Sequence, residues 1–324
     1  MAHEISSVDR VLHAVGTNMP WHKLSSEVDP NITLCENARK NGMDWEVVKH
    51  QMFRAVGSDN GPGFIEVDNQ YALVRSDIDF VLGTCTGDYE PYLNMTGFAA
   101  LDELIARSEG ALKLNVMGTI RRGAIVWGLL EVSIENEEVT AGDAIKRYFL
   151  FSFGHTGKIG ISAGWTDIRV VCSNTIHAAW SSSASKLIRI THRGGVEANV
   201  DMVMNTIDVA ARDFKATISD YKKMLNTSIN QSDIRNYVKT VLELEEKDTN
   251  KRATNMIDKI TALSATGIGN FGIQNTVWGA FNGITEFLSH QAGRNADNRY
   301  ASLWWGQNGN VLKRAHAEAM KLVA

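Results

Sequence analysis

The spacing of apolar residues changes near residue 196, and this change constrains the fold more than any other feature of the sequence. Before it, short segments such as GAIVWGLLEVSI (123–134) and YFLFSF (148–153) are rich in β-branched and aromatic residues, which is typical of strands. After it, apolar residues recur at the spacing of amphipathic helices. Strands gathered first and helices later predict an α+β fold. We expect a β-rich α+β domain with an antiparallel meander and short helices over 1–195, and a helical region over 196–324.

Capping and turn signals locate elements in the first region. TLCENARKNG has Thr33 as N-cap, Glu36 three residues later and Gly42 as a stop, which predicts a short capped helix. Asn94 is expected to cap an amphipathic helix over roughly 95–109. The turn SDNGPG predicts a hairpin between the strands on either side of it. The further strands expected are 43–53, 64–75, 79–85, 160–172 and 186–194.

The second region reads as a series of helices. The apolar spacing predicts five of them, over 196–225, 232–247, 253–264, 276–290 and 311–323. The polar stretch NTSINQSD (226–233) is the best candidate for a flexible connection among them.

Charge is distributed unevenly along the chain. Residues 1–143 hold 11 Lys+Arg against 22 Asp+Glu, a balance of −11, whereas residues 144–324 hold 22 against 15, a balance of +7. The step is steepest over 144–193, where seven cations face the single acid Asp167. These cations are Lys146, Arg147, Lys158, Arg169, Lys186, Arg189 and Arg193. Such asymmetry indicates either an anionic partner or a basic half that docks on the acidic half, within one chain or between subunits.

Aromatic residues stand beside several of these cations. Arg121 and Arg122 are expected at a hairpin tip just before a strand, Trp165 is near Arg169, and Trp180 is near Lys186. Proteins that bind single strands combine cations that follow the phosphates with planar rings that stack on bases. Tryptophans beside strands are also common core residues, and we expect most of those in this chain to be buried.

The spacings of common metal sites and the patterns of phosphate-binding loops are missing from the sequence. Cys35, Cys85 and Cys172 form no CxxC, and no HxxxH occurs, so we expect neither a metal nor a cofactor. The glycine-rich segments GHTGKIG (154–160) and GIGNFG (267–272) do not match phosphate-binding loops and are expected to be turns. An odd number of scattered cysteines, no secretory signal and no long apolar run together predict a cytoplasmic protein without a membrane span.

Segments spread over nearly the whole chain resemble an uncharacterised phage- and plasmid-borne family, a domain of unknown function. They include WHKL (21–24), GDYEPYLN (87–94), RVVCSNT (169–175), LIRITHRG (187–194) and NTVWGAFNGITEFLSHQ (275–291). The resemblance implies a setting in the DNA replication or recombination of mobile elements in the bacterial cytoplasm. At the level of architecture, residues 30–195 also resemble single-strand annealing proteins of the Red-beta, RecT and ERF type, which oligomerise and hold DNA in a basic groove.

The leading hypothesis is therefore a non-catalytic, homo-oligomeric protein that binds and anneals single-stranded DNA. The residues expected to contact phosphates are Arg121, Arg122, Lys158, Arg169, Lys186, Arg189 and Arg193, with Trp165 or Trp180 stacking on a base. One alternative is a phage protein whose acidic half binds a host or phage replication factor. Another is a small hydrolase or nucleotide-binding enzyme that uses Lys158, Cys172 and His177.

Overall fold

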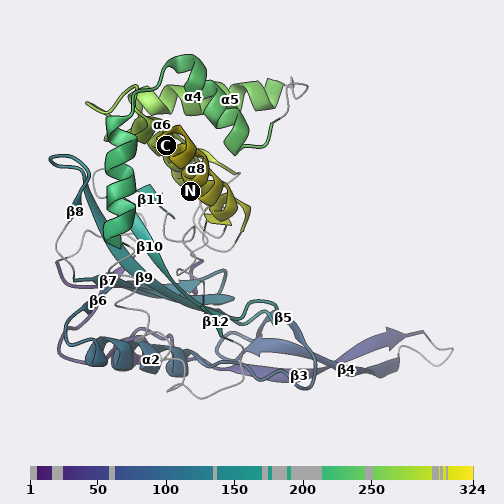
Figure 1. The fold of residues 1–324 in the computed structure, drawn as a ribbon. Helices are drawn as coiled ribbons and strands as arrows, with labels where there is room; N and C mark the ends of the chain where they lie inside the picture. Colours follow the sequence, from purple (N-terminus) through teal and green to yellow (C-terminus); the bar gives the residue numbers. More distant parts are fainter. Residues whose placement is uncertain are drawn as a thin grey trace.

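The structure is a computed structural model with two sheets and two groups of helices (Figure 1). The larger sheet forms a central layer between the two groups of helices. The residues that the structure describes are 6–16, 25–57, 63–133, 137–169, 174–176, 188–190, 214–244, 251–293, 299, 302–303 and 306–323. The strands come first along the chain and the long helices follow, so the predicted α+β class is confirmed. The expected boundary between 195 and 196 lies outside the described residues.

The main sheet is almost entirely antiparallel, and only its short edge pair β1–β2 is parallel. Its principal strands are β6 (Leu112–Ile120), β7 (Ile125–Val132), β9 (Ala144–Gly154) and β10 (Ile161–Arg169), which lie side by side in the order β10-β9-β7-β6. Short strands complete it. β1 (Val11–His13) and β2 (Ser26–Glu27) follow β6 at one edge, β11 (Asn174–Ile176) and β12 (Ile188–Ile190) pair with β10 at the other, and β8 (Glu137–Glu138) pairs with β9.

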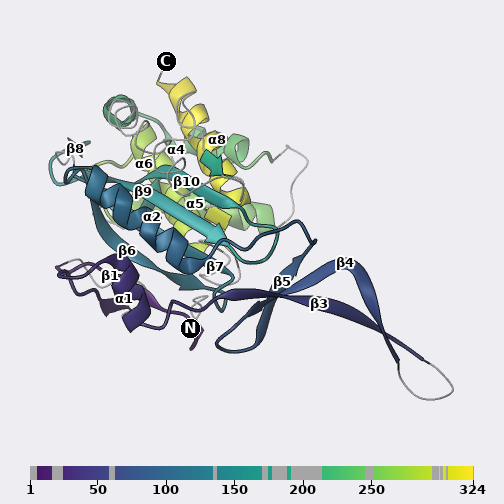
Figure 2. The ribbon, with the colours of Figure 1, turned by 90° about the horizontal axis from the view of Figure 1, so that it is seen from below.

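The second sheet is the predicted hairpin with one more strand added. β3 (Val47–Val56) pairs with β4 (Gly63–Arg75), and β4 pairs with β5 (Phe80–Cys85), all antiparallel. This sheet projects from the side of the molecule as an arm (Figure 2).

Helices cover both faces of the main sheet. The capped helix α1 (Leu34–Lys40) and α2 (Asn94–Arg107) lie on one face. The helices of the second region lie on the other face: 214–226, α4 (Gln231–Val241), α5 (Lys251–Thr266), α6 (Val277–Glu286) with its π-helical extension η3 (Phe287–Gln291), and α8 (Gln307–Leu322). Among the described residues, no helix is both long and apolar enough to cross a bilayer.

Strand β7 shows why the central sheet binds both layers together. Successive side chains of a strand point to opposite faces. Ile125 and Trp127 accordingly join the core beneath the C-terminal helices, while Val126 and Leu130 join the core beneath α2. A strand that is buried on both faces needs apolar residues at nearly every position, which explains the unbroken apolar run in its sequence.

Two local expectations were wrong, and both concern polar residues. Asn94 does not cap α2, because it is the first residue of that helix and its buried side chain donates to the carbonyl of Met43. The stretch 226–233 is not a free connection. Ser228 forms an antiparallel bridge with Thr276, and Asn230 caps α4 by accepting a hydrogen bond from the backbone of Asp233. Polar side chains that serve as caps and bridges resemble those of a linker when only composition is considered.

The arm is anchored to the main sheet by a reciprocal close approach of two glycines. A Cβ atom at Gly83 in β5 would overlap the carbonyl oxygen of Thr156, and a Cβ atom at Gly157 would overlap the carbonyl oxygen of Thr84. Gly157 also has a φ of +75°, in the left-handed region. The segment GHTGKIG is therefore the turn that we expected, and it docks β5 against the sheet.

Gly157→Ala is expected to destabilise the protein by about 3 kcal/mol, because it adds an atomic overlap to the cost of a left-handed alanine. Gly142→Ala is the matched control, since Gly142 has a φ of +81° but open space around its Cβ position. The control should cost only about 1 kcal/mol. Urea unfolding followed by circular dichroism measures both values. Equal losses would mean that the close approach between β5 and the sheet contributes nothing.

Candidate nucleic-acid interface

Exposed cations from separate segments meet at the end of the main sheet from which the arm projects. Ile125 pairs with both Ile120 and Gly154, so the turn 121–124 and the loop 155–160 emerge side by side. The amide of His155 donates to the carbonyl of Ala124 at 2.9 Å and joins the two segments.

We call the exposed side chains of Arg10, Arg121, Arg122 and Lys158 the basic end of the sheet. Arg10 belongs to it because its amide and carbonyl pair with Thr119 on β6, at N···O distances of 3.1 and 2.8 Å. The four residues come together because the turn 121–124, the loop 155–160 and the segment at Arg10 all lie at the same end of the strands.

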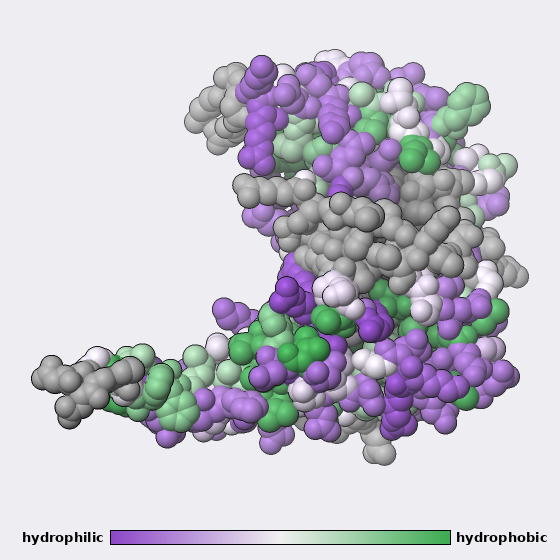
Figure 3. Space-filling model, turned by 180° about the vertical axis from the view of Figure 1, so that it is seen from behind, coloured by the Kyte–Doolittle hydropathy of each residue, from purple (hydrophilic) through white to green (hydrophobic). Residues whose placement is uncertain are grey.

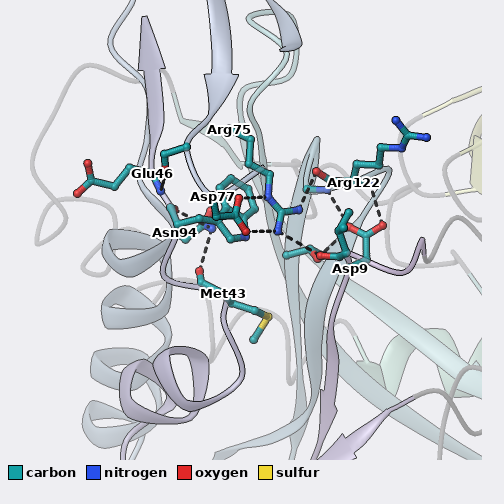
Figure 4. A network of polar contacts seen from close by, with 12 residues as sticks. Asp9, Met43, Glu46, Arg75, Asp77, Asn94 and Arg122 are labelled. Carbon is teal, nitrogen blue, oxygen red and sulfur yellow. Dashed lines mark hydrogen bonds and ion pairs between the residues drawn. The ribbon is translucent and has the colours of Figure 1, made fainter. Parts of the chain in front are cut away.

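The turn that carries Arg121 and Arg122 is held by a buried carboxylate. Both arginines have positive φ, 57° and 58°, a conformation that side-chain-bearing residues seldom adopt. Asp9, which is 4% exposed, accepts hydrogen bonds from the amides of Arg122 and Gly123 at 2.9 and 2.8 Å. It also accepts one from the hydroxyl of Thr119 at 3.0 Å. Figure 4 shows the Arg122 guanidinium directed away from this network while its backbone lies within it.

Arg75 joins the same turn to the base of the arm. Its side chain is 1% exposed, and its guanidinium donates to the carbonyl of Arg122 at 2.9 Å and to the carboxylate of Asp77 at 2.7 Å. The guanidinium also lies 4.2 Å from the centre of the Trp45 ring. Arg75 is thus a structural cation, and the arm and the turn form one connected unit (Figure 4).

His155 has a structural role as well. It is 1% exposed, and its Nε2 lies 2.8 Å from the Oδ1 of Asn94, whose amide nitrogen donates to Met43. Because an amide oxygen can only accept, this contact places a proton on Nε2. The ring also meets Trp45 edge-on at a centroid distance of 5.3 Å. The histidine therefore fastens the 154–160 loop to α2 and does not add to the basic surface.

Residues 81–304, more than half of the chain, match the family described as Domain of unknown function (DUF932). The chain belongs to the DUF932 family. No curated protein and no solved structure matches it. The DUF932 match contains Arg121, Arg122 and Lys158, whereas Asp9 and Arg10 precede it.

Within the DUF932 match, the structure groups some of the predicted phosphate contacts and separates others. The backbone of Arg189 in β12 pairs with Ser162 at the start of β10, so it reaches the same end of the sheet as Arg121, Arg122 and Lys158. Arg169 is at the opposite end of β10, eight residues from Ile161 and therefore about 26 Å away. Lys186, Arg193 and Trp180 lie outside the described residues.

Trp165 does not present its ring at the surface. It is 8% exposed and packs edge-on against Phe149 at a centroid distance of 5.0 Å, in the core beneath α2. Trp45, just before β3, and Trp127, in β7, are buried too, as expected of tryptophans near strands. Trp278, in α6, is also buried. A ring that already fills a packed core cannot stack on a base without opening that core.

Part of the positive charge of residues 144–193 is neutralised by ion pairs within the chain. Arg147 and Asp167 form a buried ion pair, with 2.7 Å between Nε and Oδ1, and side-chain exposures of 1% and 0%. Lys146 pairs with Glu131 across the sheet at 2.6 Å. Of these two pairs, the one between Lys146 and Glu131 joins the basic half of the chain to the acidic half, whereas Arg147 and Asp167 both belong to residues 144–324. The basic end stays at the surface.

Sequence reasoning did not identify Asp9, Arg10 and Arg75. Asp9 and Thr119 are 110 positions apart, and nothing in the sequence near Asp9 marks it as the acceptor for a distant turn. The one available signal was the pair of arginines at a hairpin tip, where positive φ calls for support from outside the turn.

In the second glycine-rich segment, a backbone amide already donates to a carboxylate of the same chain. In GIGNFG, the amide of Ile268 donates to the carboxylate of Glu286 at 2.9 Å, and Glu286 is 5% exposed. Asn270, which is fully buried, ties the same loop to the carbonyl of Leu263. The loop is thus a turn, as expected, and its amide is directed at an internal carboxylate.

The described part of the chain contains two free thiols, Cys35 and Cys85. The described residues contain no group of three or more residues that could hold a metal ion. Burial and the neighbouring Asp102 raise the pKa of Cys35 to about 11, and burial raises the pKa of Cys85, so both thiols stay protonated at neutral pH. Cys172 and His177, which were predicted to act with Lys158, lie outside the described residues, while Lys158 itself is exposed.

Proposed function

We propose that this DUF932 protein binds single-stranded DNA without catalysing a covalent reaction, and that the basic end of the sheet contacts the phosphates. The proposal rests on one observation. Four exposed cations, distant in sequence, converge at one end of the sheet, and the backbone of Arg189 reaches the same end. The setting that we propose, from the resemblance of the sequence, is replication or recombination of mobile-element DNA in the bacterial cytoplasm.

The chemistry of the basic end suits a phosphate backbone. Guanidinium groups donate several hydrogen bonds in a planar array that matches phosphate oxygens, and they stay charged at any physiological pH. The buried Asp9 holds the turn that carries two of them, so little ordering is needed when a strand binds. Phosphate contacts carry no base information, and we expect binding with little sequence preference.

The proposal can be tested by measuring how salt changes the binding of a labelled DNA single strand of about 30 nucleotides. Fluorescence anisotropy reports the binding. If five cations including Arg189 each neutralise one phosphate, the slope of log K against log salt should be about −3.5. A duplex competitor should displace the strand poorly. A slope near zero would contradict the proposal and favour the alternative in which the protein binds a host factor.

Charge reversal of Arg121 and Arg122 to Glu should flatten the slope by about 1.4 and weaken binding at least about 25-fold at 0.1 M salt. The matched control reverses Arg107 and Lys113, two cations that change the net charge equally. Lys113 lies at the far end of β6, about 27 Å from the turn. An equal loss in both variants would mean that net charge, and not the basic end, governs binding.

A further inference from the structure

The outer part of the arm is a two-stranded ribbon that presents aromatic rings to solvent. In this ribbon, residues 53–56 of β3 pair with residues 63–66 of β4. Phe64 opposes Ala55, which is two positions from Phe53 and lies on the same face of β3. The two rings are therefore diagonal neighbours on one face, and Phe53 is 57% exposed and Phe64 73%. Figure 3 shows hydrophobic residues along the described part of the arm.

Side-chain contacts fix the course of the arm below the ribbon. Where the pairing of β3 with β4 shifts, the side-chain amide of Gln51 donates to the carbonyl of Val67 at 2.7 Å. The side-chain oxygen of Asn69, a residue with a φ of 51°, accepts a hydrogen bond from the backbone amide of Gly87 at 2.8 Å. Because the strands already have their final course, little ordering is needed when a ligand meets the two rings.

The base of the arm lies against the basic end of the sheet. The guanidinium of Arg122 lies 4.7 Å from the centre of the Phe80 ring, and Phe80 is the first residue of β5. Phe80 opposes Arg75 on β4, and Arg75 in turn opposes Val47 on β3. Phe53 is six residues from Val47, which is about 20 Å along the strand. A ligand that contacts Arg122 and continues along the arm therefore reaches the two rings.

The arm has no surplus of positive charge with which to hold phosphates. Over its described residues, 47–56 and 63–85, three cations stand against four acids, a balance of −1. In the ribbon, the exposed side chains of Arg54 and Glu66 lie on opposite faces, and Glu66 shares the face of Phe53. A carboxylate repels phosphates, so this face suits a flat and uncharged group. The faces of nucleic-acid bases are such groups, and proteins that hold single strands stack aromatic side chains on them.

The small size of the ribbon favours bases over a protein as the ligand. The paired segments 53–56 and 63–66 comprise eight residues, whereas a stable protein interface takes about 20–30 residues from each partner. Stacking needs less surface, because one ring covers one base. Among the described residues, the exposed aromatic side chains are those of Phe53, Phe64 and Phe271, and the first two are on the arm.

We propose that Phe53 and Phe64 stack on the bases of a single strand whose phosphates are bound at the basic end of the sheet. This inference rests on the proposed function and adds to it the cause of strand selectivity. Base faces are accessible in a single strand, whereas in a duplex they are covered by the neighbouring base pairs. The two rings take the role that was expected of Trp165, which is buried.

Fluorescence anisotropy with the labelled single strand tests the two rings. Phe53→Leu with Phe64→Leu removes the rings but keeps apolar side chains on the ribbon. The affinity should fall at least about tenfold, because lost stacking costs at least about fivefold for each ring and leucine keeps part of the contact. The slope of log K against log salt should stay at about −3.5, because the phosphate contacts are unchanged. Phe53→Tyr with Phe64→Tyr keeps both rings and should bind as the wild type does.

Phe271→Leu is the matched control, because it makes the same change at a ring that is 95% exposed but belongs to the loop between α5 and α6. It should bind the single strand as the wild type does. The preference of the wild type for a single strand over a duplex should be kept in this control and should shrink in the Phe53/Phe64 leucine variant.

A strand with abasic sites along its length gives a second, more specific test. It keeps the phosphates but lacks the bases, so the wild type should bind it at least about tenfold more weakly than the intact strand. The Phe53/Phe64 leucine variant should bind the abasic strand as the wild type does, because it has no stacking left to lose. The four affinities form a cycle that isolates the contact between rings and bases.

Failure of stacking and failure of strand binding give different results. A wild-type chain that does not bind the single strand contradicts both stacking and the proposed function. A wild-type chain that binds with a slope of about −3.5, and whose leucine variant binds equally well, contradicts stacking alone. Stacking is also contradicted if the leucine variant loses as much affinity for the abasic strand as for the intact one, if Phe271→Leu loses equally, or if the tyrosine variant binds as weakly as the leucine variant.

Discussion

Arg147→Met is expected to destabilise the protein by about 3–5 kcal/mol, because it leaves the carboxylate of Asp167 buried without its cation. The two side chains form a bidentate pair, with 2.7 Å between Nε and Oδ1 and 3.0 Å between Nη2 and Oδ2. The guanidinium also lies 4.7 Å from the centre of the Phe214 ring, so this pair contributes to the docking of helix 214–226 on the sheet. Chemical denaturation followed by circular dichroism measures the loss.

A double variant separates the cost of an unpaired charge from the value of the pair itself. Arg147→Met with Asp167→Leu should recover most of the lost stability, because apolar residues of similar size can replace a buried ion pair. Lys146→Met is the matched control, since its pair with Glu131 is 31% and 29% exposed and should be worth less than about 1 kcal/mol. If the double variant is as unstable as Arg147→Met alone, the charge left on Asp167 is not the cause.

Asp9→Ala is expected to destabilise the protein by about 3 kcal/mol and to weaken DNA binding at the same time. The substitution leaves the amides of Arg122 and Gly123 and the hydroxyl of Thr119 without their acceptor. Buried donors without partners cost about 1–3 kcal/mol each, and relaxation of the turn offsets part of that sum. Unfolding free energy and strand affinity, measured on the same preparation, check the two effects together.

Asp44→Ala is the control for Asp9→Ala, because it removes an exposed carboxylate and changes the net charge equally. It should leave stability within about 0.5 kcal/mol of the wild type. Removing a negative charge alone should slightly favour binding of a polyanion. If Asp9→Ala binds DNA more tightly and is as stable as the control, Asp9 does not hold the turn.

Local signals in the sequence predicted the elements correctly where the interactions that form them are also local. The box of Thr33 and Glu36 caps α1 as expected, with the Thr33 side chain accepting from the Glu36 amide at 3.1 Å and the Glu36 carboxylate accepting from the Thr33 amide at 2.9 Å. The hairpin of β3 and β4 and the order of strands and helices also follow from alternation, turn residues and apolar spacing. Membership of an uncharacterised family could be inferred from the sequence as well, and the DUF932 match confirms it.

The candidate site depended on contacts between distant parts of the chain. Arg169 and Arg189 are separated by 20 positions and looked equivalent as basic residues, yet antiparallel pairing places them at opposite ends of β10. In the sequence, Trp165 resembles any aromatic ring near a cation. In the structure it is buried in the core formed by α2 and β9. Arg147 adds to the positive charge of the sequence, but in the structure it forms a buried ion pair with Asp167 on the neighbouring strand.

The sequence by itself determined the α+β class, the capped helix, the arm hairpin and the uneven distribution of charge, because propensity, alternation and charge are properties of neighbouring residues. Only the tertiary structure decided which cations face solvent together, and it did so through contacts such as that of Asp9 with a turn more than 100 positions away. The physical reason is that strand pairing and burial act between residues that meet only after the chain has folded. For residues far apart in the sequence, the separation does not tell whether two charged side chains will lie side by side, form an ion pair or stand at opposite ends of a strand.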